Sequence, residues 1–209
     1  MTFLVDGTLG GTFPSWTTAT RPASPAVGQM GYNTTTGQFD AYTSNGWTSV
    51  ATSSTTPTSG PTFSATSNAT QTISVNVFTL INLQTKTWDT ATAFNNTGST
   101  TTLNGISVPA YAFAPPVAGY YQVNFSIDSG SGSTSPSRAL SSLYKNAANY
   151  RNASNFIGTT AYSGMGSSLV YLNGTSDYIQ MYGLISAATA IVSNISSQTF
   201  FEAFLARTA

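Results

Sequence analysis

The sequence contains no cysteine and no histidine. It therefore cannot form disulfides, thiolate nucleophiles or a Ser-His-Asp triad, and a zinc site would lack the nitrogen and sulfur ligands that zinc prefers. Glycosidases need two carboxylates about 5–10 Å apart across a sugar cleft, and nothing in the spacing of the acidic residues indicates such a pair. We expect no enzymatic activity. The six acidic residues are Asp6, Asp40, Asp89, Asp128, Asp177 and Glu202.

Charge is also scarce. Charged residues make up 6% of the chain, against about 25% in an average soluble domain. The net charge is +0, so the basic surface of a nucleic-acid-binding protein is missing. No apolar run reaches the roughly 18 residues of a membrane span, and residues 1–6 lack the features of a signal peptide. A hydroxyl-rich and amide-rich chain without an export signal fits a virion component that lysis releases.

Calcium is the one cofactor that the acidic residues could bind. Asp128 and Asp177 lie near predicted turns, but calcium takes about six to eight oxygen ligands, several of them from carboxylates. Isolated carboxylates are more often solvated or hydrogen-bonded loop residues. We therefore expect no cofactor, with calcium at these positions as the alternative.

The chain divides at a low-complexity stretch, residues 51–61, that is rich in Ser, Thr, Gly and Pro. It has no apolar periodicity and is predicted to be a linker between an N-terminal module, 1–50, and a head, 62–209. An ordinary surface loop is the alternative. The N-terminal module is predicted to be a small β-meander with strands at 29–32, 38–42 and 47–50. Its apolar face is expected to consist of Tyr32, Phe39, Tyr42 and Trp47.

The head contains several segments that alternate between apolar and polar residues. After Pro115 and Pro116, which cannot donate to a central ladder, Tyr121, Val123 and Phe125 are predicted to share one face of a strand. A further strand is predicted over 73–83. In the segments 178–185 and 200–205 both faces carry apolar residues, so both must be covered. A threefold axis would cover the second face, and a thick monomeric core is the alternative. The predicted core or trimer contacts are Tyr121, Val123, Phe125, Tyr178, Tyr182, Phe200, Phe201 and Phe204.

Several of these segments, in this order, resemble the jelly-roll heads of the first complement component and the tumour-necrosis-factor superfamily. The matching segments are Phe63-Ser64-Ala65, residues 111–121, Leu143 to Asn146, Leu169 to Met181, and Phe201 to Leu205. Two features depart from the family pattern: Thr175 and Ser176 separate Gly174 from Asp177, and Ala203 replaces a glycine. The resemblance implies an all-β protein whose head is an antiparallel jelly-roll sandwich that assembles as a homotrimer.

Residues 17–47 resemble a module of bacteriophage tail-fibre and virion appendage proteins, with a generic three-stranded meander as the alternative. The resemblance implies a non-enzymatic virion protein whose N-terminal module binds other virion proteins and whose head recognises the host surface, through a glycan for example. A capsid decoration or head-fibre protein is the alternative, because the chain is short for a fibre and holds no coiled-coil heptads. A secreted signalling head is disfavoured by the missing signal peptide and stalk.

Ligand contacts are expected from side chains with flat apolar faces or amides. The candidates are Trp88, Asp89, Tyr150, Arg151 and Asn152. For Trp88 a core position is an equal alternative. The loop 130–136, Gly-Ser-Gly-Ser-Thr-Ser-Pro, is either a recognition loop or a spacer, and we favour the spacer.

Overall fold

The structure is a computed structural model that describes residues 4–6, 10–50, 60–153, 156–157 and 163–209. The chain forms two compact units, residues 1–58 and residues 59–209. The second unit is called the head below. Apart from residues 60 and 61, the predicted linker 51–61 lies outside the described residues.

The N-terminal unit is a small β-structure, as expected. A hairpin of β1 (Leu4–Asp6) and β2 (Gly10–Thr12) precedes a four-stranded sheet in chain order. The sheet contains β3 (Ser15–Trp16), β4 (Met30–Asn33), β5 (Gln38–Thr43) and β6 (Gly46–Ser49). The last three strands form the predicted meander. The parallel pairing of β3 with β4 was not predicted. A single 3₁₀ turn, η1 (Thr18–Thr20), follows β3.

The four aromatic residues predicted to share one face of this sheet lie on two faces, so that prediction is wrong. Phe39 and Tyr42 are three positions apart on β5, and alternation along a strand places them on opposite sides. Tyr32 packs on Phe39 on one face, and Trp47 packs on Tyr42 on the other.

The buried centre of the unit is Trp16, which the sequence analysis did not include. Its ring lies over Gly31, where a Cβ atom would come within 2.3 Å of the indole. Only glycine leaves room for this contact. The same indole meets Trp47 at 5.0 Å between ring centroids, so Trp16 ties β3 to both β4 and β6.

A buried carboxylate lies beside Trp16. The Oδ2 atom of Asp40, whose residue is 2% exposed, accepts hydrogen bonds from Arg21 Nη2 at 2.8 Å, Asn33 Nδ2 at 2.9 Å and Trp16 Nε1 at 3.4 Å. Burial acts to raise the pKa of Asp40. The hydrogen bonds from Asn33, Arg21 and Trp16 and the positive charge of Arg21 outweigh burial and hold that pKa below its usual value.

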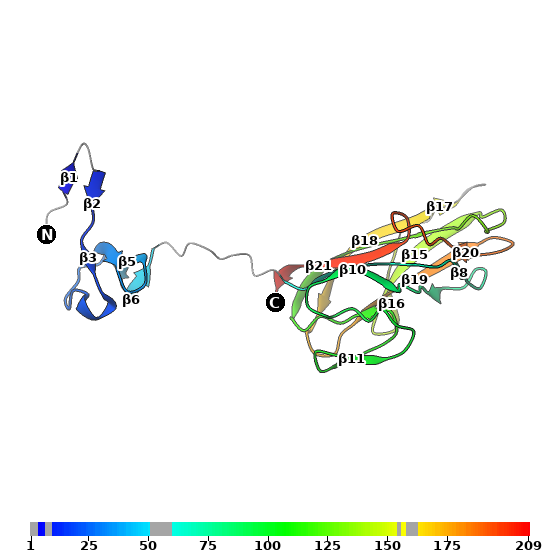
Figure 1. Ribbon diagram of the computed structural model, residues 1–209, viewed down its shortest axis with the longest axis horizontal. Helices are drawn as coiled ribbons and strands as arrows, with labels where there is room; N and C mark the ends of the chain where they lie inside the picture. The colour runs from blue at the N-terminus through cyan, green and yellow to red at the C-terminus, as the bar shows by residue number, and fades with distance from the viewer. Residues whose placement is uncertain (1–3, 7–9, 51–59, 154–155, 158–162) are drawn as a thin grey trace. The chain divides into compact units, whose positions relative to one another are not determined.

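The head is a sandwich of two antiparallel sheets (Figure 1). The five-stranded sheet contains, in spatial order, β10 (Thr85–Asp89), β7 (Thr62–Thr66), β21 (Phe200–Thr208), β14 (Gly119–Asp128) and β18 (Ser163–Leu172). The six-stranded sheet contains β13 (Ala112–Phe113), β19 (Ile179–Ser186), β15 (Arg138–Lys145) and β16 (Ala148–Asn152), with β17 (Phe156–Ile157) on β15 and β9 (Thr79–Leu80) on β19. The head also contains two separate two-stranded sheets. One pairs β11 (Thr101–Leu103) with β12 (Ile106–Val108), and the other pairs β8 (Gln71–Thr72) with β20 (Ile191–Val192).

The main core fills the space between the two sheets. Phe63 stacks on Phe94 and Phe113, with ring centroids 4.8 and 4.3 Å apart, and meets the edge of Phe201. The alternation predicted for 121–127 is present, because the odd-numbered residues of β14 are buried in this core. The two-sheet jelly roll that the sequence predicted is therefore confirmed.

The continuous strand predicted over 73–83 is not present. β8 ends just before this segment, only the two-residue β9 forms within it, and the chain turns between the two strands, where Asn76 adopts a φ of +59°. Val75 and Val77 are exposed beside this turn, whereas Ile73 and Ile81, which a continuous strand would place on the same face, are buried. Asparagine tolerates the left-handed region through local hydrogen bonding, and this signal competed with the apolar alternation.

Two hairpins of the head form a matched pair. Asn104-Gly105 joins β11 to β12 and Asn146-Ala147 joins β15 to β16, and all four residues have positive φ. Such two-residue turns favour Asn-Gly, because a side chain at the second position is strained.

We expect Ala147→Gly to raise the free energy of unfolding by about 1 kcal/mol, measured by thermal or urea denaturation. Gly105→Ala is the reciprocal control and should lower it by a similar amount; an Ala147→Gly protein of unchanged or lower stability would contradict the prediction.

The Asp40 cluster should make the N-terminal unit acid-sensitive. Because the folded pKa lies below the unfolded value of about 3.9, the stabilisation is complete above that pH and is lost as the pH falls through the folded pKa. Asp40→Asn should cost about 2 kcal/mol at neutral pH and should reduce the acid sensitivity. The fluorescence of Trp16 and Trp47 reports this in a Trp88→Phe background, since the chain has three tryptophans.

The exposed Thr48→Ala change on β6 is the control for the Asp40 experiment. It should leave both the stability and its pH dependence unchanged. Equal acid sensitivity in Asp40→Asn and the parent protein would show that Asp40 does not cause it.

Candidate functional site

The outer face of the five-stranded sheet carries apolar side chains that the described chain leaves uncovered. Paired residues of antiparallel strands share a face, and three of the rows that cross this one carry apolar side chains. Leu169, Gln122 and Phe204 form the first row, Met165, Ser126 and Phe200 the second, and Tyr171 pairs with Tyr120 in the third. Met165 is 62%, Leu169 51% and Phe204 48% exposed. This outer face is called the sheet face below.

A row of polar residues crosses the middle of the sheet face. Ser167 Oγ donates to Asn124 Oδ1 at 3.0 Å, and Asn124 Nδ2 donates to Glu202 Oε1 at 3.3 Å. Gln122 Nε2 donates to Ser167 Oγ at 2.6 Å. These hydrogen bonds satisfy polar groups within one chain, so a partner that covers the face need not supply all of their contacts.

The predicted packing residues lie in three different places. Tyr121, Val123, Phe125 and Phe201 are buried between the two sheets. Phe200 and Phe204 lie on the sheet face. Tyr178 and Tyr182 lie toward the outside of the six-stranded sheet, where this chain itself provides contacts. Tyr178 packs on a second cluster formed by Ile106, Val108, Ala112 and Ala114, and Tyr182 stacks on Tyr144 with ring centroids 3.9 Å apart.

The ligand candidates Trp88 and Asp89 are adjacent in sequence but differ in role. Trp88 lies on the sheet face, 46% exposed, and its Nε1 donates to Thr62 Oγ1 at 3.3 Å. Together with Phe204 it lines a shallow hollow of about 260 Å³. Asp89 points inward, where its carboxylate accepts from the backbone N–H groups of Ala93 and Phe94 at 2.9 and 3.1 Å. Asp89 therefore holds a turn and is not available to a ligand.

Tyr150, Arg151 and Asn152 lie exposed on β16, at the edge of the six-stranded sheet. The guanidinium of Arg151 lies over the ring of Tyr150, and the hydroxyl of Tyr150 donates to the carbonyl of Leu169 at 3.1 Å. Asn152 Oδ1 accepts from Ser142 and Asn149. The structure thus does not bring the two groups of ligand candidates together, since one lies on the sheet face and the other on β16.

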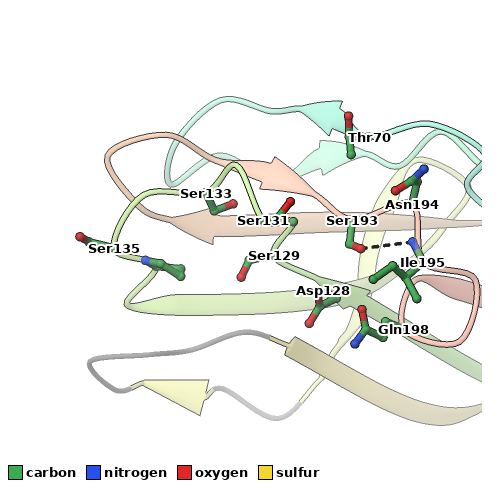
Figure 2. Close-up of a pocket in the computed structure, with 12 residues that line it drawn as sticks. Thr70, Asp128, Ser129, Ser131, Ser133, Ser135, Ser193, Asn194, Ile195 and Gln198 are labelled. Atoms are coloured by element: carbon green, nitrogen blue, oxygen red, sulfur yellow. Dashed lines mark hydrogen bonds between the residues drawn. The ribbon is translucent and has the colours of Figure 1, made fainter.

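A second hollow of the head lies away from all of the predicted ligand candidates. Its volume is about 620 Å³, and it lies at the end of β14, between the loop 128–136, the segment 193–198 and Thr70 (Figure 2). The loop that we favoured as a spacer forms one wall of this hollow. Only the serine-rich composition of 129–135 pointed to it, because the three segments are far apart in the sequence.

The electrostatics of the hollow are set by Asp128. Its carboxylate is half-buried with no ion pair or hydrogen bond from the described residues, and burial raises its pKa. Ser129 beside it has a buried hydroxyl that finds no partner among the described atoms. Two other serines are engaged: Ser133 Oγ donates to the Ile191 carbonyl at 2.9 Å, and Ser193 Oγ accepts from the Ile195 N–H at 3.2 Å.

Asp177, the other calcium candidate, lies at the opposite end of the sandwich in the turn after β18. Burial acts to raise its pKa, but hydrogen bonds from Lys145 and Asn146, the charge of Lys145 and a backbone N–H of Asn173 lower it. The Lys145 Nζ atom is 2.9 Å from the carboxylate. Asp128 and Asp177 therefore belong to separate sites, and no cluster of three or more acidic, histidine or cysteine residues occurs in the described part of the chain.

Among the described residues of the two surfaces, no hydrogen bond pairs a nucleophile with a base. The sheet face offers apolar contact, and the hollow offers hydroxyl, amide and carboxylate groups that form hydrogen bonds. Both arrangements fit binding. Within the described ranges, no helix is long and apolar enough to cross a membrane.

No protein-family model and no curated protein matches the chain. Among solved structures, Eiger, a TNF from S. frugiperda, is 11% identical over 72% of this chain and 95% of its own, with a TM-score of 0.51. The globular domain of zebrafish complement 1qA protein is 17% identical over 71% and 99%, with a TM-score of 0.49. The PRD1 vertex protein P5 is 15% identical over 69% and 94%, with a TM-score of 0.41. The likeness to Eiger shows the fold of the head, which is the jelly roll of tumour-necrosis-factor-like proteins.

Proposed function

We propose that this protein is a non-enzymatic, homotrimeric virion component whose head recognises the host surface. The observation that carries the proposal is the sheet face. Its exposed aromatic and aliphatic side chains lie on β10, β21, β14 and β18, on both sides of the polar row formed by Ser167, Asn124 and Glu202. An apolar patch of this kind marks an interaction surface, and a second and third copy of the same head would cover it.

Symmetry explains why the partner would be the same chain. In a closed threefold assembly every interface joins one region of a copy to a different region of the next copy, so the sheet face of each head is covered by the neighbouring heads. The other sheet needs no such partner at Tyr178 and Tyr182, which pack on residues of their own chain. This difference between the two sheets supports trimerisation through β10-β7-β21-β14-β18.

The virion role is supported by the N-terminal unit. Its meander over β4, β5 and β6 occupies the residues that resemble tail-fibre modules. A unit of this size that folds around Trp16 and Asp40 can serve as an attachment module for another virion protein. The head is then the part available for contact with a host surface, through a glycan for example.

Capsid decoration is the second candidate. It is favoured by the sequence between the two units, residues 51–61, which contains no coiled-coil heptads that would hold the head far from the N-terminal module. In that role the same trimer would adorn or stabilise the shell.

The trimer has a direct mutational test. Light scattering on the full chain should give three times the chain mass of 21.8 kDa. Phe204→Glu places a carboxylate in the middle of the sheet face, and we expect it to yield a monomer that keeps its β-structure. Val77→Glu, at a side chain 52% exposed outside the sheet face, is the matched control and should remain trimeric. A monomeric parent protein would contradict the trimer.

The location of the protein on particles tests the role. Gold-labelled antibodies against residues 62–209, viewed by electron microscopy on virions that carry the protein, should mark the tail tip or tail fibres. Soluble protein should then reduce adsorption to the host. Label spread over the capsid would instead favour decoration, and particles without label would contradict the virion role.

A further inference from the structure

The hollow beside Asp128 lies at the end of the head away from Pro61 and the C-terminus. The strand β14 runs the length of the sandwich: Gly119 pairs with Thr208 at one end, and Asp128 is the last residue at the other. Ten extended residues separate these ends by about 30 Å. Pro61, where the head begins, accepts a hydrogen bond from Leu205 close to the first end. In Figure 1 the C-terminus and the strands β8 and β20 lie at opposite ends of the head.

The sheet face and the hollow do not share their exposed groups. None of the exposed apolar side chains of the sheet face lines the hollow. Assembly of three heads through the sheet face would therefore leave each hollow accessible. The trimer would present three such hollows at the end distant from the linker.

The lining of the hollow divides into groups that hold its walls and groups that are free to bind. Ser133 joins the loop to Ile191, both by donating to its carbonyl and by accepting from its N–H at 3.0 Å. The side chains of Asp128, Ser129, Asn194 and Gln198 have no hydrogen-bond partner among the described residues. Small-molecule sites are concave and largely preformed, and their polar groups fix the orientation of the ligand. The free donors and acceptors of this hollow can take that role.

The side chains that line the hollow limit the chemical class of ligand that it can bind. No lysine or arginine lines the hollow among the described residues, and Asp128 would repel an anion. A divalent cation such as calcium needs several carboxylate ligands, and Asp128 is the only carboxylate among the described lining residues. The apolar side chains that line it are Pro136 and the exposed Ile195, and polar side chains outnumber them. A ligand with several neutral hydroxyl groups matches the free serine, amide and carboxylate groups, and Ile195 can contact its C–H groups.

We infer that this hollow binds an uncharged sugar unit of a glycan, with the Asp128 carboxylate accepting hydrogen bonds from sugar hydroxyls. The inference rests on the host-recognition role proposed above and names its site. The volume of about 620 Å³ lies within the range of small-molecule sites, about 300–1,000 Å³. Ser129, 4% exposed and unpartnered, gains a hydrogen-bond partner when its hydroxyl turns toward the ligand.

The test uses saturation-transfer NMR on the full chain with free glucose, galactose, mannose and N-acetylglucosamine, and with glucuronic acid as the anionic comparison. At least one neutral sugar should bind at millimolar concentration, and glucuronic acid should bind more weakly. Asp128→Asn removes a charged acceptor and should weaken binding about tenfold. Ser131→Tyr places a ring at the exposed rim of the hollow and should abolish binding.

The matched control is Ser107→Tyr, at an exposed serine on β12 that does not line the hollow. It should bind the sugar as the parent protein does, and the melting temperature of each variant checks its fold. Absence of binding by all four neutral sugars, binding retained in Ser131→Tyr, or binding that requires added calcium would each overturn the inference.

The same proteins separate this inference from the proposed function. If the parent protein blocks adsorption of the virus and Ser131→Tyr blocks it equally, host recognition stands and the sugar site is elsewhere, which overturns the inference. If neutral sugars bind in the hollow but the protein marks the capsid and does not affect adsorption, the site is supported and the host-recognition role fails.

Discussion

The head depends on one constraint, the alternation of side chains along β14. This strand pairs with β21 on one side and with β18 on the other. Its alternation therefore determines which side chains of the five-stranded sheet face the core and which face outward. Its odd-numbered residues fill the core against Phe63 and Phe113, and its even-numbered residues form the centre of the sheet face. A shift of one residue in register would exchange these two sets and expose the core. The same strand ends at Asp128 and so also positions the hollow.

Much of this arrangement could be predicted from sequence because it depends on local periodicity. The alternation around Tyr121 and Phe125, the proline-bounded start of β14 and the final strand at Phe201 are all visible in short windows. The strand expected over 73–83 failed for a local reason too, since Asn76 turns the chain in the left-handed region. Alternation identifies residues that can form a strand, but it does not detect a turn within the same segment.

The features that escaped prediction depend on residues far apart in the chain. Nothing in the sequence around Asp40 indicates that it is buried, because its partners Arg21, Asn33 and Trp16 come from other parts of the chain. Asp89 similarly reads as a ligand candidate, whereas it binds backbone N–H groups of a turn. The hollow requires three segments to meet, and no single one of them has a distinctive pattern. Such sites need the fold before their chemistry can be recognised.

The ion pairs of this protein have a wider consequence. Asp40, Asp89 and Asp177 each bind a basic side chain of their own unit, which leaves few unpaired charges in a chain where charge is already rare. Long-range electrostatic attraction, which steers many proteins to their partners and weakens with added salt, is therefore nearly absent. The rates at which this protein meets other molecules should therefore depend little on long-range charge and change little with salt concentration.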